Sequence, residues 1–419
     1  MSLLGEAGAT MARWKTRRSV VALAASLALL VAACDDGGGG GSGSDDPGAD
    51  LDGEPIKLIT IGGFTAFSND FTQIPAAAQA AADAINADGG VDGRPVEIIV
   101  CDYPDESQAA DCGRQAVDED VVATVGSFSN AAAEYEPFLE DAGIPQVAIF
   151  PTALDDYTSP MSYPVFGGAL SLVAGMGSQL ADGGAETISV VYVDIAAGAL
   201  SAGLVETGAE PGGAEVVAEV AVPPGTVEFS PQIATATEDD PDGLAVLLTS
   251  RDAPGFLRQL WQSGYEGQVA AAISAVTPAQ LDELGDAAEG LFLTSGFKPP
   301  TLTEDAAVKQ FNDEMDSYAP DVSRDDTAQS AWVGVHLVAQ MLDGVKNPTP
   351  AKLRHALDNA EKLDLGLVAP FSFDQGLEVP ELAPGLELRI FNTKILYTEV
   401  ENGEPVAVDN GRFVNALEQ

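Results

Sequence analysis

The sequence predicts an α/β fold built of two doubly wound parallel-sheet lobes. Short β-rich runs alternate with helical stretches of roughly 10–15 residues, which is typical of βαβ units on a parallel sheet. Several of these runs stop at glycine, a residue that commonly ends helices. The alternation restarts after Pro164, so we expect two such lobes in series.

The first half begins with a predicted strand, Ile56–Ile61, which ends at Gly62-Gly63. Pro75 lies in the first turn of a predicted helix that runs to Asp88 and stops at Gly89-Gly90. The remaining expected elements of this half are the strand Val96–Cys101, the helix Ser107–Glu119, the strand Val121–Val125, the helix Asn130–Ala142 and the strand Pro145–Ile149.

The second half repeats the alternation. Its expected elements are the helix Leu170–Ala181, the strand Ile188–Val193, the helix Ala199–Gly208, the strand Val216–Val222, a helix from Ser230, the strand Leu244–Thr249, the helix Pro254–Ser263 and the strand Gln268–Ile273. Three later helices (Glu304–Tyr318, Thr327–Asp343 and Pro350–Asn359) and a β-rich tail (Leu386–Val400) must return to one half or the other.

Composition narrows the possible functions. The 419 residues include 65 Asp and Glu against 19 Lys and Arg, a formal charge of −46 that would repel phosphate, so we expect no nucleic-acid partner. With two histidines and three cysteines, the chain has little from which to build a histidine triad or a Cys/His zinc site. We therefore expect no metal, no cofactor and no catalytic residues, and an exported binding or scaffolding protein rather than an enzyme. The acidic surface is also compatible with a solvated coat.

The N-terminus predicts export. A basic stretch from Arg13 to Arg18 precedes the apolar run Val20–Ala33, which is shorter than the roughly 20 residues that span a bilayer. The end of this run, Val-Ala-Ala-Cys34, resembles the lipobox of bacterial lipoproteins. That resemblance implies a signal peptide at 1–33 and acyl chains on Cys34, which anchor the protein in the lipid bilayer at the outer face of the cytoplasmic membrane, in the periplasm or at the cell surface. The alternative is an ordinary signal peptide with an incidental cysteine. Residues 34–54, rich in Gly, Ser and Asp, predict a flexible tether.

Loops at the carboxyl ends of the predicted strands are the expected binding site, because ligands of open parallel sheets lie there. They carry hydroxyls, amides, glycine and phenylalanine, with few charges, and helix starts among them favour an anion. Two facing halves of this kind bind a small molecule by hinge closure. The loops are Gly62–Phe71, Gly126–Asn130, Phe150–Thr152, Asp194–Gly198, Thr249–Asp252 and Ser274–Thr277.

Five short motifs occur in an order that resembles one known family. They are Ala84–Arg94 (AINADGGVDGR), Asp141–Pro145, Val222–Ser230, Phe256–Leu260 and Ala288–Phe292. In this order they resemble the branched-chain amino-acid binding proteins of ABC transporters, which have the type I periplasmic-binding fold. The resemblance implies two lobes joined by three crossovers, 56–165 plus 295–367 and 166–294 plus 368–419. It also implies a monomer that delivers a small-molecule ligand to an ABC permease.

The resemblance implies several ligand-binding positions. Asn130 stands where the family has a carboxylate-binding serine, and the family's threonine in the next loop is kept as Thr152. The carbonyl of Phe150 falls where the family meets the ligand amine. In the second lobe, Ser274 stands where the family has the acid that binds the ligand amine. Ala197 stands near the position of a family tyrosine that packs on the ligand. The other positions expected to bind ligand are Phe64, Thr65, Phe71 and Ala131, together with Thr249 and Ser250, one of which replaces a second tyrosine.

These substitutions predict the ligand class. The family's acid in the crossover helix corresponds to Leu172, so the half of the site that binds an ammonium looks lost and the half that binds an anion is partly kept. A buried, unpaired ammonium costs several kcal/mol. Because Phe64, Phe67, Phe71, Phe128 and Phe150 crowd the first-lobe loops, we expect a small apolar or aromatic carboxylate or amide. Asp70 or Asp194 would restore an acid, which keeps an amino acid open. Asn130 and Thr152 could equally be helix caps, and the phenylalanines lobe packing.

Two further pairs of residues have structural interpretations. Cys101 and Cys112 lie eleven residues apart, and export favours a disulfide between them over two buried thiols. His336 lies in an apolar helix and His355 in a basic one, so both are expected to be structural or exposed. The leading prediction is thus the solute-binding receptor of an ABC importer. The alternative is a ligand-sensing or scaffold lipoprotein that signals to a membrane kinase.

Overall fold

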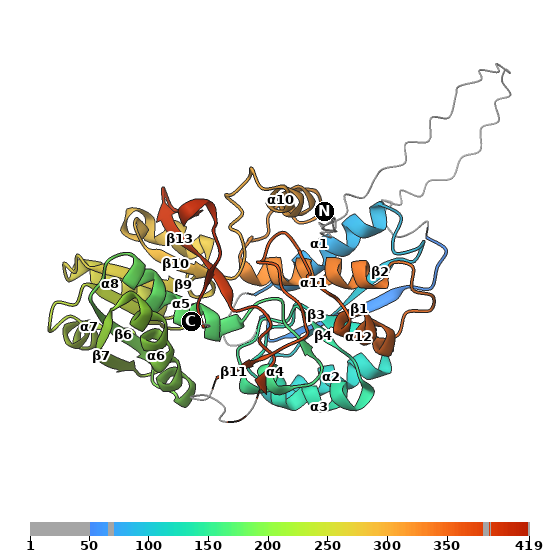
Figure 1. Ribbon diagram of the computed structural model, residues 1–419, viewed down its shortest axis with the longest axis horizontal. Coiled ribbons are helices and arrows are strands. Elements are labelled where there is room, and N and C mark those ends of the chain that lie inside the picture. The colour runs from blue at the N-terminus through green and yellow to red at the C-terminus, as the bar shows by residue number, and fades with distance from the viewer. Residues whose placement is uncertain (1–50, 66–70, 380–384, 386, 418–419) are drawn as a thin grey trace, which may run out of the picture.

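The computed structural model describes residues 51–65, 71–379, 385 and 387–417. The predicted signal peptide, Cys34, most of the tether, Phe67 and Asp70 lie outside these residues. In the described part of the chain, no helix is long and apolar enough to cross a bilayer. The described residues form two large sheets that lie side by side, each covered by helices, and a separate two-stranded hairpin (Figure 1).

The first sheet is parallel, with the strand order β2-β1-β3-β4-β5. Side chains alternate across it: Ile56 and Leu58 of β1 belong to the core beneath α1 and α11, whereas Ile59 and Ile61 belong to the core beneath α2 and α3. The strands are β1 (Ile56–Gly62), β2 (Val96–Asp102), β3 (Ala123–Val125), β4 (Gln146–Val147) and β5 (Ser162–Tyr163). The helices are α1 (Gln73–Ala87), α2 (Ala109–Asp118), α3 (Ala132–Ala142), α4 (Leu154–Thr158) and α11 (Asp326–Leu342).

The second sheet has the order β14-β13-β10-β9-β8-β6-β7, with β15 paired to β13. Its strands β6 to β10 are parallel, while β13 and β14 are antiparallel. The strands are β6 (Thr187–Val193), β7 (Glu215–Val222), β8 (Gly243–Leu247), β9 (Gln268–Ala272), β10 (Phe292–Ser295), β13 (Lys394–Glu401), β14 (Glu404–Ala407) and β15 (Val414–Asn415). Helices α5 (Gly168–Asp182) and α6 (Ala196–Ala209) pack in one core, and α7 (Ser230–Ala236), α8 (Ala253–Gln262) and α9 (Pro278–Leu284) in another.

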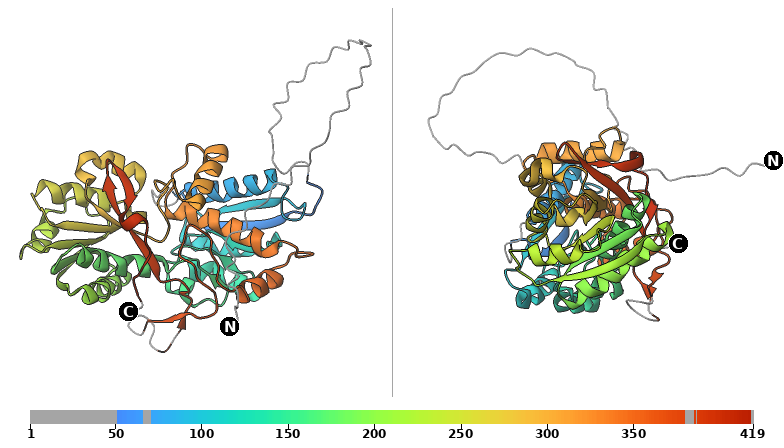
Figure 2. Two further views of the ribbon diagram at one scale, coloured as in Figure 1. Left: turned by 45° about the horizontal axis from the view of Figure 1, so that its top comes forward. Right: turned by 90° about the vertical axis from the view of Figure 1, so that its left-hand side faces the viewer.

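The chain passes between the two sheets three times. After β10 it returns to the first sheet, where α10 (Ala306–Tyr318) and α11 pack against α1, and α12 (Pro350–Asp358) packs against α11. These orange helices lie beside the blue and teal elements in Figures 1 and 2. The chain then passes a short hairpin, β11 (Leu377–Glu378) with β12 (Glu387–Leu388), and enters the second sheet at β13. The expected fold class, two doubly wound lobes joined by three crossovers, is confirmed.

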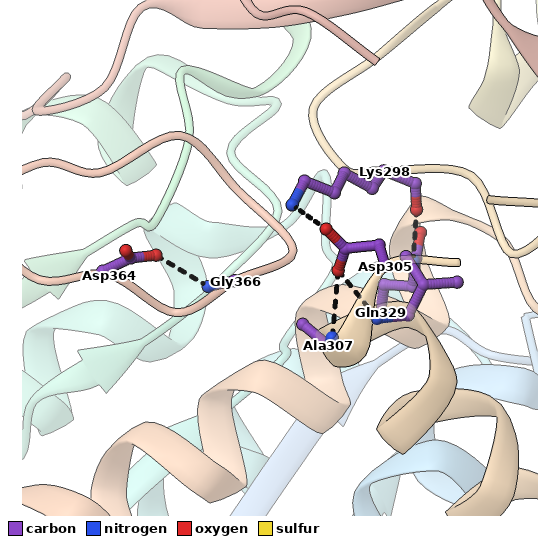
Figure 3. Close-up of polar contacts among 7 residues, drawn as sticks. Lys298, Asp305, Ala307, Gln329, Asp364 and Gly366 are labelled. Atoms are coloured by element: carbon purple, nitrogen blue, oxygen red, sulfur yellow. Dashed lines mark hydrogen bonds and ion pairs between the residues drawn. The ribbon is translucent and has the colours of Figure 1, made fainter. Parts of the chain in front are cut away.

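Hydrogen bonds tie the three connections to one another. The side-chain amide of Asn392, in the third connection, donates to the carbonyl of Val165 in the first (3.0 Å) and to that of Ala369 (3.1 Å). The backbone N–H of Lys298, in the second, donates to the carbonyl of Leu367 (2.9 Å). Gln329 of α11 holds the carbonyl of Lys298 at 2.8 Å, as Figure 3 shows. The connections therefore form one hydrogen-bonded layer.

The second connection is also anchored where α10 begins. Asp305 caps this helix by accepting hydrogen bonds from the N–H groups of Ala307 (2.9 Å) and Val308. Its other oxygen pairs with the ammonium of Lys298 at 2.5 Å (Figure 3). In the third connection, Asp364 accepts from the N–H of Gly366, whose φ of 78° is the left-handed region that glycine adopts freely.

Several details of the predicted elements were wrong. The helix expected over Ser107–Glu119 begins as a 3₁₀ turn, Glu106–Gln108, and the strand expected over Pro145–Ile149 is only β4. The β-rich tail expected from Leu386 has its long strand only at Lys394–Glu401. Short elements were not predicted at all because two to seven residues carry too little periodicity: α4, β5, α9, β10, β11, β14 and β15.

Candidate ligand-binding site

Loops that follow the strands of the first sheet meet at one edge. Gly62, at the end of β1, pairs with Phe128 in the loop after β3. The N–H of Phe150, after β4, donates to the carbonyl of Ser127 at 3.0 Å. Because parallel strands end at the same edge, backbone pairing alone gathers three of the predicted loops.

A row of aromatic rings runs away from this edge toward the connections. The ring centroids of Phe71 and Phe128 are 4.7 Å apart, and those of Phe128 and Phe150 are 5.5 Å apart. The row continues from Phe150 to Phe166 at 4.9 Å and from Phe166 to Phe297 at 5.1 Å. Phe166 and Phe297 lie in the first and second connections, so aromatic packing links the loops to the layer between the sheets.

Phe64 and Phe150 were predicted to bind the ligand, but they are only 1% and 3% exposed. Their rings pack in the core and do not line the pocket described next. Phe71 and Phe128 lie at the end of the row and line a small pocket. Of the predicted binding residues, this pocket brings together Phe71 and Asn130. Its full lining is Gly63, Phe71, Tyr103, Glu106, Phe128, Ser129 and Asn130, around a volume of about 30 Å³.

Hydroxyl groups organise the loop after β3. The hydroxyl of Tyr103 lies 2.7 Å from Oγ of Ser129, which accepts a hydrogen bond from the N–H of Ala131 at 2.9 Å. Thr152 donates its hydroxyl to the carbonyl of Ser129 at 3.2 Å. Burial raises the pKa of Tyr103, so this hydroxyl keeps its proton at physiological pH. Asn130 itself is exposed, two residues before α3 begins.

Two acidic side chains bind backbone N–H groups in the loops where ligand binding was predicted. Asp102 accepts from the N–H of Phe64 at 2.8 Å and from the hydroxyl of Thr65 at 2.6 Å. Asp156 accepts from the N–H groups of Thr152 and Ala153, both at 2.9 Å. Burial raises the pKa of Asp156 to about 7. Both acids therefore hold the loops in place, and the N–H groups that they bind already have hydrogen-bond partners within the protein.

The predicted residues of the second sheet lie on separate loops. Ala197 is in the first turn of α6. Thr249 is exposed and accepts hydrogen bonds from the N–H of Asp252, while the carbonyl of Ser250 accepts from the amide of Gln280. Ser274 lies in a 3₁₀ turn, Ile273–Ala275, that packs against α11 on the first sheet. Ser274 is thus the predicted second-sheet residue whose turn reaches the first sheet.

Sequence reasoning missed Tyr103, Glu106 and Ser129 as pocket residues. A usable signal existed for the first two, because they follow the carboxyl end of β2 and the same rule that selected the other loops applies there. Ser129 lies within a loop that was selected, one position before Asn130. Leu172, at the position of the family's acid, is buried in α5 with 1% exposure.

The side chains that line the pocket are suited to binding by apolar contact and hydrogen bonds. Within the described ranges, no cluster of three His, Cys, Asp or Glu could hold a metal ion. The histidines are accounted for elsewhere: Nε2 of His336 lies 2.8 Å from Glu314, and His355 is exposed on α12. Aromatic rings, hydroxyls, an amide and one carboxylate suit the reversible recognition of a small molecule.

Comparisons with known proteins agree with this architecture. A family model described as periplasmic binding protein matches residues 58–377. No curated protein matches the chain. A substrate-binding periplasmic protein from Ralstonia solanacearum is similar in structure, with a TM-score of 0.70 and 21% identity over 84% of this chain and 100% of that one.

Two other solved structures are similar in the same way. A leucine-binding protein from Thermotoga maritima has a TM-score of 0.68 and 18% identity, over 86% of this chain and 99% of its own. A solute-binding protein of an ABC transporter from Rhodopseudomonas palustris, in complex with 3,4-dihydroxybenzoic acid, has a TM-score of 0.67 and 21% identity, over 87% and 98%. The resemblance predicted from the motifs is confirmed, and the chain belongs to the periplasmic binding protein family of extracytoplasmic receptors, which bind their substrates and are not enzymes.

Proposed function

We propose that this protein is a lipid-anchored receptor of an ABC importer that captures a small carboxylate, amide or amino-acid-like ligand between two lobes by hinge closure. The observation that carries the proposal is the pocket at the edge of the first sheet, where exposed Asn130 lies beside the rings of Phe71 and Phe128. The lobes comprise 56–165 plus 295–367 and 166–294 plus 368–419. Two residues of the segment 368–419 contact the edge of the first sheet. Nε of Arg389 donates to the carbonyl of Ser162, and the ring of Phe373 packs against that of Tyr163.

The size of the pocket supports capture by closure. Its volume of about 30 Å³ is close to the space of one water molecule, whereas pockets for small ligands measure roughly 300–1,000 Å³. A ligand held on Phe71 and Asn130 therefore needs the loops of the second lobe to enclose it. Thr249 and Ser274, on those loops, supply the hydroxyls, and the hydrogen-bonded connections supply the hinge.

The chemistry of the pocket favours an apolar or aromatic body with a carboxylate or amide. The rings of Phe71 and Phe128 offer apolar contact, and the Asn130 amide donates to an anion. The proteins from T. maritima and R. palustris are described with leucine and with 3,4-dihydroxybenzoic acid, both small carboxylates. This likeness supports the ligand class without naming the ligand.

Calorimetric titration and thermal shift with benzoates, aliphatic acids, amides and leucine test the proposal. A ligand present at about 100 times its Kd adds about 2.7 kcal/mol of stability. Asn130→Ala should weaken carboxylate binding about tenfold, equivalent to about 1.4 kcal/mol, with the unfolding free energy unchanged. Asn359→Ala, at an exposed position just after α12 and away from the pocket, is the matched control. The proposal fails if no compound shifts the unfolding transition, or if both variants change affinity equally.

A further inference from the structure

The loop between β2 and α2, residues 103–108, is held at both ends. A disulfide joins Cys101, in β2, to Cys112, in α2. Cys112 is buried against the core beneath α2 and α3, so the bridge fixes the loop to the body of the first sheet. We call residues 103–108 the β2–α2 loop.

Tyr103 attaches the β2–α2 loop to the binding edge. Its backbone N–H donates to the carbonyl of Gly62 at 3.1 Å, and its hydroxyl lies 2.7 Å from Oγ of Ser129. The side chain is 4% exposed. One residue thus connects the β2–α2 loop to the loops after β1 and after β3, both of which line the pocket.

The next residues form a rigid turn. Asp105 caps the 3₁₀ turn Glu106–Gln108, accepting hydrogen bonds from the N–H of Ser107 at 3.0 Å and from its hydroxyl at 2.6 Å. Glu106, the first residue of this turn, is exposed and lines the same pocket as Phe71 and Asn130. The backbone that carries Glu106 is therefore fixed by a cap, a tyrosine anchor and a disulfide.

The electrostatics of the pocket are one-sided. Among the described residues that line it, Glu106 carries the carboxyl group, and no Lys or Arg belongs to the lining. The neighbouring carboxylate of Asp102 is already engaged by Phe64 and Thr65. A ligand carboxylate near Glu106 would be repelled, whereas a donor group would gain a charge-assisted hydrogen bond.

We infer that the β2–α2 loop is a specificity element in which the Glu106 carboxylate accepts a hydrogen bond from a donor group, a hydroxyl or an ammonium, on the bound ligand. The inference rests on the proposed function and narrows its ligand class to donor-bearing small carboxylates. The apolar body of the ligand lies on Phe71 and Phe128, and its own carboxylate points away from Glu106, toward Asn130. Glu106 thereby supplies, from the first lobe, the acid that the second lobe lacks at Ser274.

Matched ligand pairs test this assignment by calorimetry on the wild-type protein. 4-Hydroxybenzoate with benzoate, and leucine with 4-methylpentanoate, differ by the donor group. In at least one pair, the donor-bearing member should bind tenfold or more tightly to the wild type. Glu106→Ala should reduce that preference at least fivefold. Glu106→Gln separates the two donors, because a neutral acceptor still serves a hydroxyl but no longer pairs with an ammonium.

Asp118→Asn is the control, since it removes one negative charge from an exposed position on α2 that does not line the pocket. Binding of the donor-free member reports that the pocket is intact in every variant. If Glu106→Ala changes both members of each pair by the same factor, or neither, the inference is wrong while the proposed function stands. The inference is equally wrong if the wild type prefers the donor-free members. A wild type that binds none of the four compounds contradicts the proposed ligand class itself.

Discussion

The hydroxyl of Ser295 lies 2.6 Å from Oδ1 of Asp326, and this contact joins the end of β10 in the second sheet to the start of α11 on the first. Oδ2 of Asp326 accepts from the N–H of Gly296 at 2.8 Å. Oγ of Ser295 also lies 2.6 Å from the carbonyl of Phe297. Because a hydroxyl has one proton, a Ser295 that donates to Phe297 must accept from a protonated Asp326.

Stability should fall as pH rises through the titration of Asp326. Burial, with 1% of the residue exposed, raises the pKa of Asp326 to about 7, above its unfolded value of about 3.9. Between the two pKa values the folded state binds more protons than the unfolded state. The stability that protonated Asp326 contributes is therefore complete below about pH 4 and is lost as the pH rises to about 7. Burial also raises the pKa values of Glu136 and Asp156, to about 8 and about 7. Both residues therefore contribute a loss of stability in the same direction as the pH rises.

Asp326→Asn isolates the contribution of that residue. The amide reproduces the hydrogen bonds of a protonated carboxyl, with Nδ2 donating to Ser295 and Oδ1 accepting from Gly296. We expect the loss of unfolding free energy between pH 5 and pH 8, measured by urea denaturation, to be smaller in the variant by about 2–3 kcal/mol. The exposed Asp313→Asn should leave the slope unchanged. Parallel pH profiles for wild type and Asp326→Asn would contradict the assignment.

The disulfide should stabilise the protein modestly. Cys101→Ser with Cys112→Ser should lower the unfolding free energy by at most about 3 kcal/mol, because the bridge closes a short loop. The bridge itself is tested on a protein that keeps Cys101 and Cys112 and carries only Cys34→Ala. Thiol titration of this protein, unreduced and denatured, should detect no free thiol. Two free thiols per chain would exclude the bridge.

Asn392 should be needed for the layer of connections. Asn392→Ala removes the donor shared by Val165 and Ala369 and leaves two carbonyls in a buried position. We expect a loss of about 2–4 kcal/mol in urea unfolding, from the lost hydrogen bonds and the unsatisfied acceptors. Gln79→Ala, which removes an exposed hydrogen bond to Asp83, should cost less than about 0.5 kcal/mol. Equal effects of the two variants would show that Asn392 has no special role.

Membrane attachment should depend on Cys34. In a cell that processes lipoproteins, Cys34→Ala should move the protein from the membrane fraction to the soluble fraction, because the acyl chains supply the apolar anchor. Ligand affinity of the released protein should equal that of the wild type. Retention of Cys34→Ala in the membrane fraction would show that another segment provides the attachment.

Much of the fold could be predicted from the sequence because each long element carries its own period. Ile56, Leu58, Ile59 and Ile61 alternate between two cores, and glycine ends α3 at Gly143. The return of α10 to α12 to the first sheet was expected only through the resemblance, since packing between distant segments leaves no local signal. β10 was missed because its four residues are too few to show a period.

The candidate site was predicted in part. Asn130 and Phe71 line the pocket, because strand ends in a parallel sheet converge whatever the side chains are. The engagement of the Thr152 amide by Asp156 could not be read from sequence, since it depends on the short, aperiodic helix α4. Glu106 was missed because the loop after β2 was left out of the predicted binding loops, although the same strand-end rule applies to it.

Positions along the row of rings from Phe71 to Phe297 differ in how well they tolerate substitution, because their burial differs. At the pocket end, a substitution at Phe128 alters a partly exposed ring that lines the pocket, and under the proposed function it would change ligand selectivity. Further in, Phe166 and Phe297 have no exposed surface, so a change of volume there leaves a cavity or forces neighbouring rings out of place. Substitutions that adapt the site to new compounds, in nature or in biosensor engineering, are thus expected at the outermost rings. The inner rings, Phe166 and Phe297, are expected to stay unchanged because they pack between the connections of the two lobes.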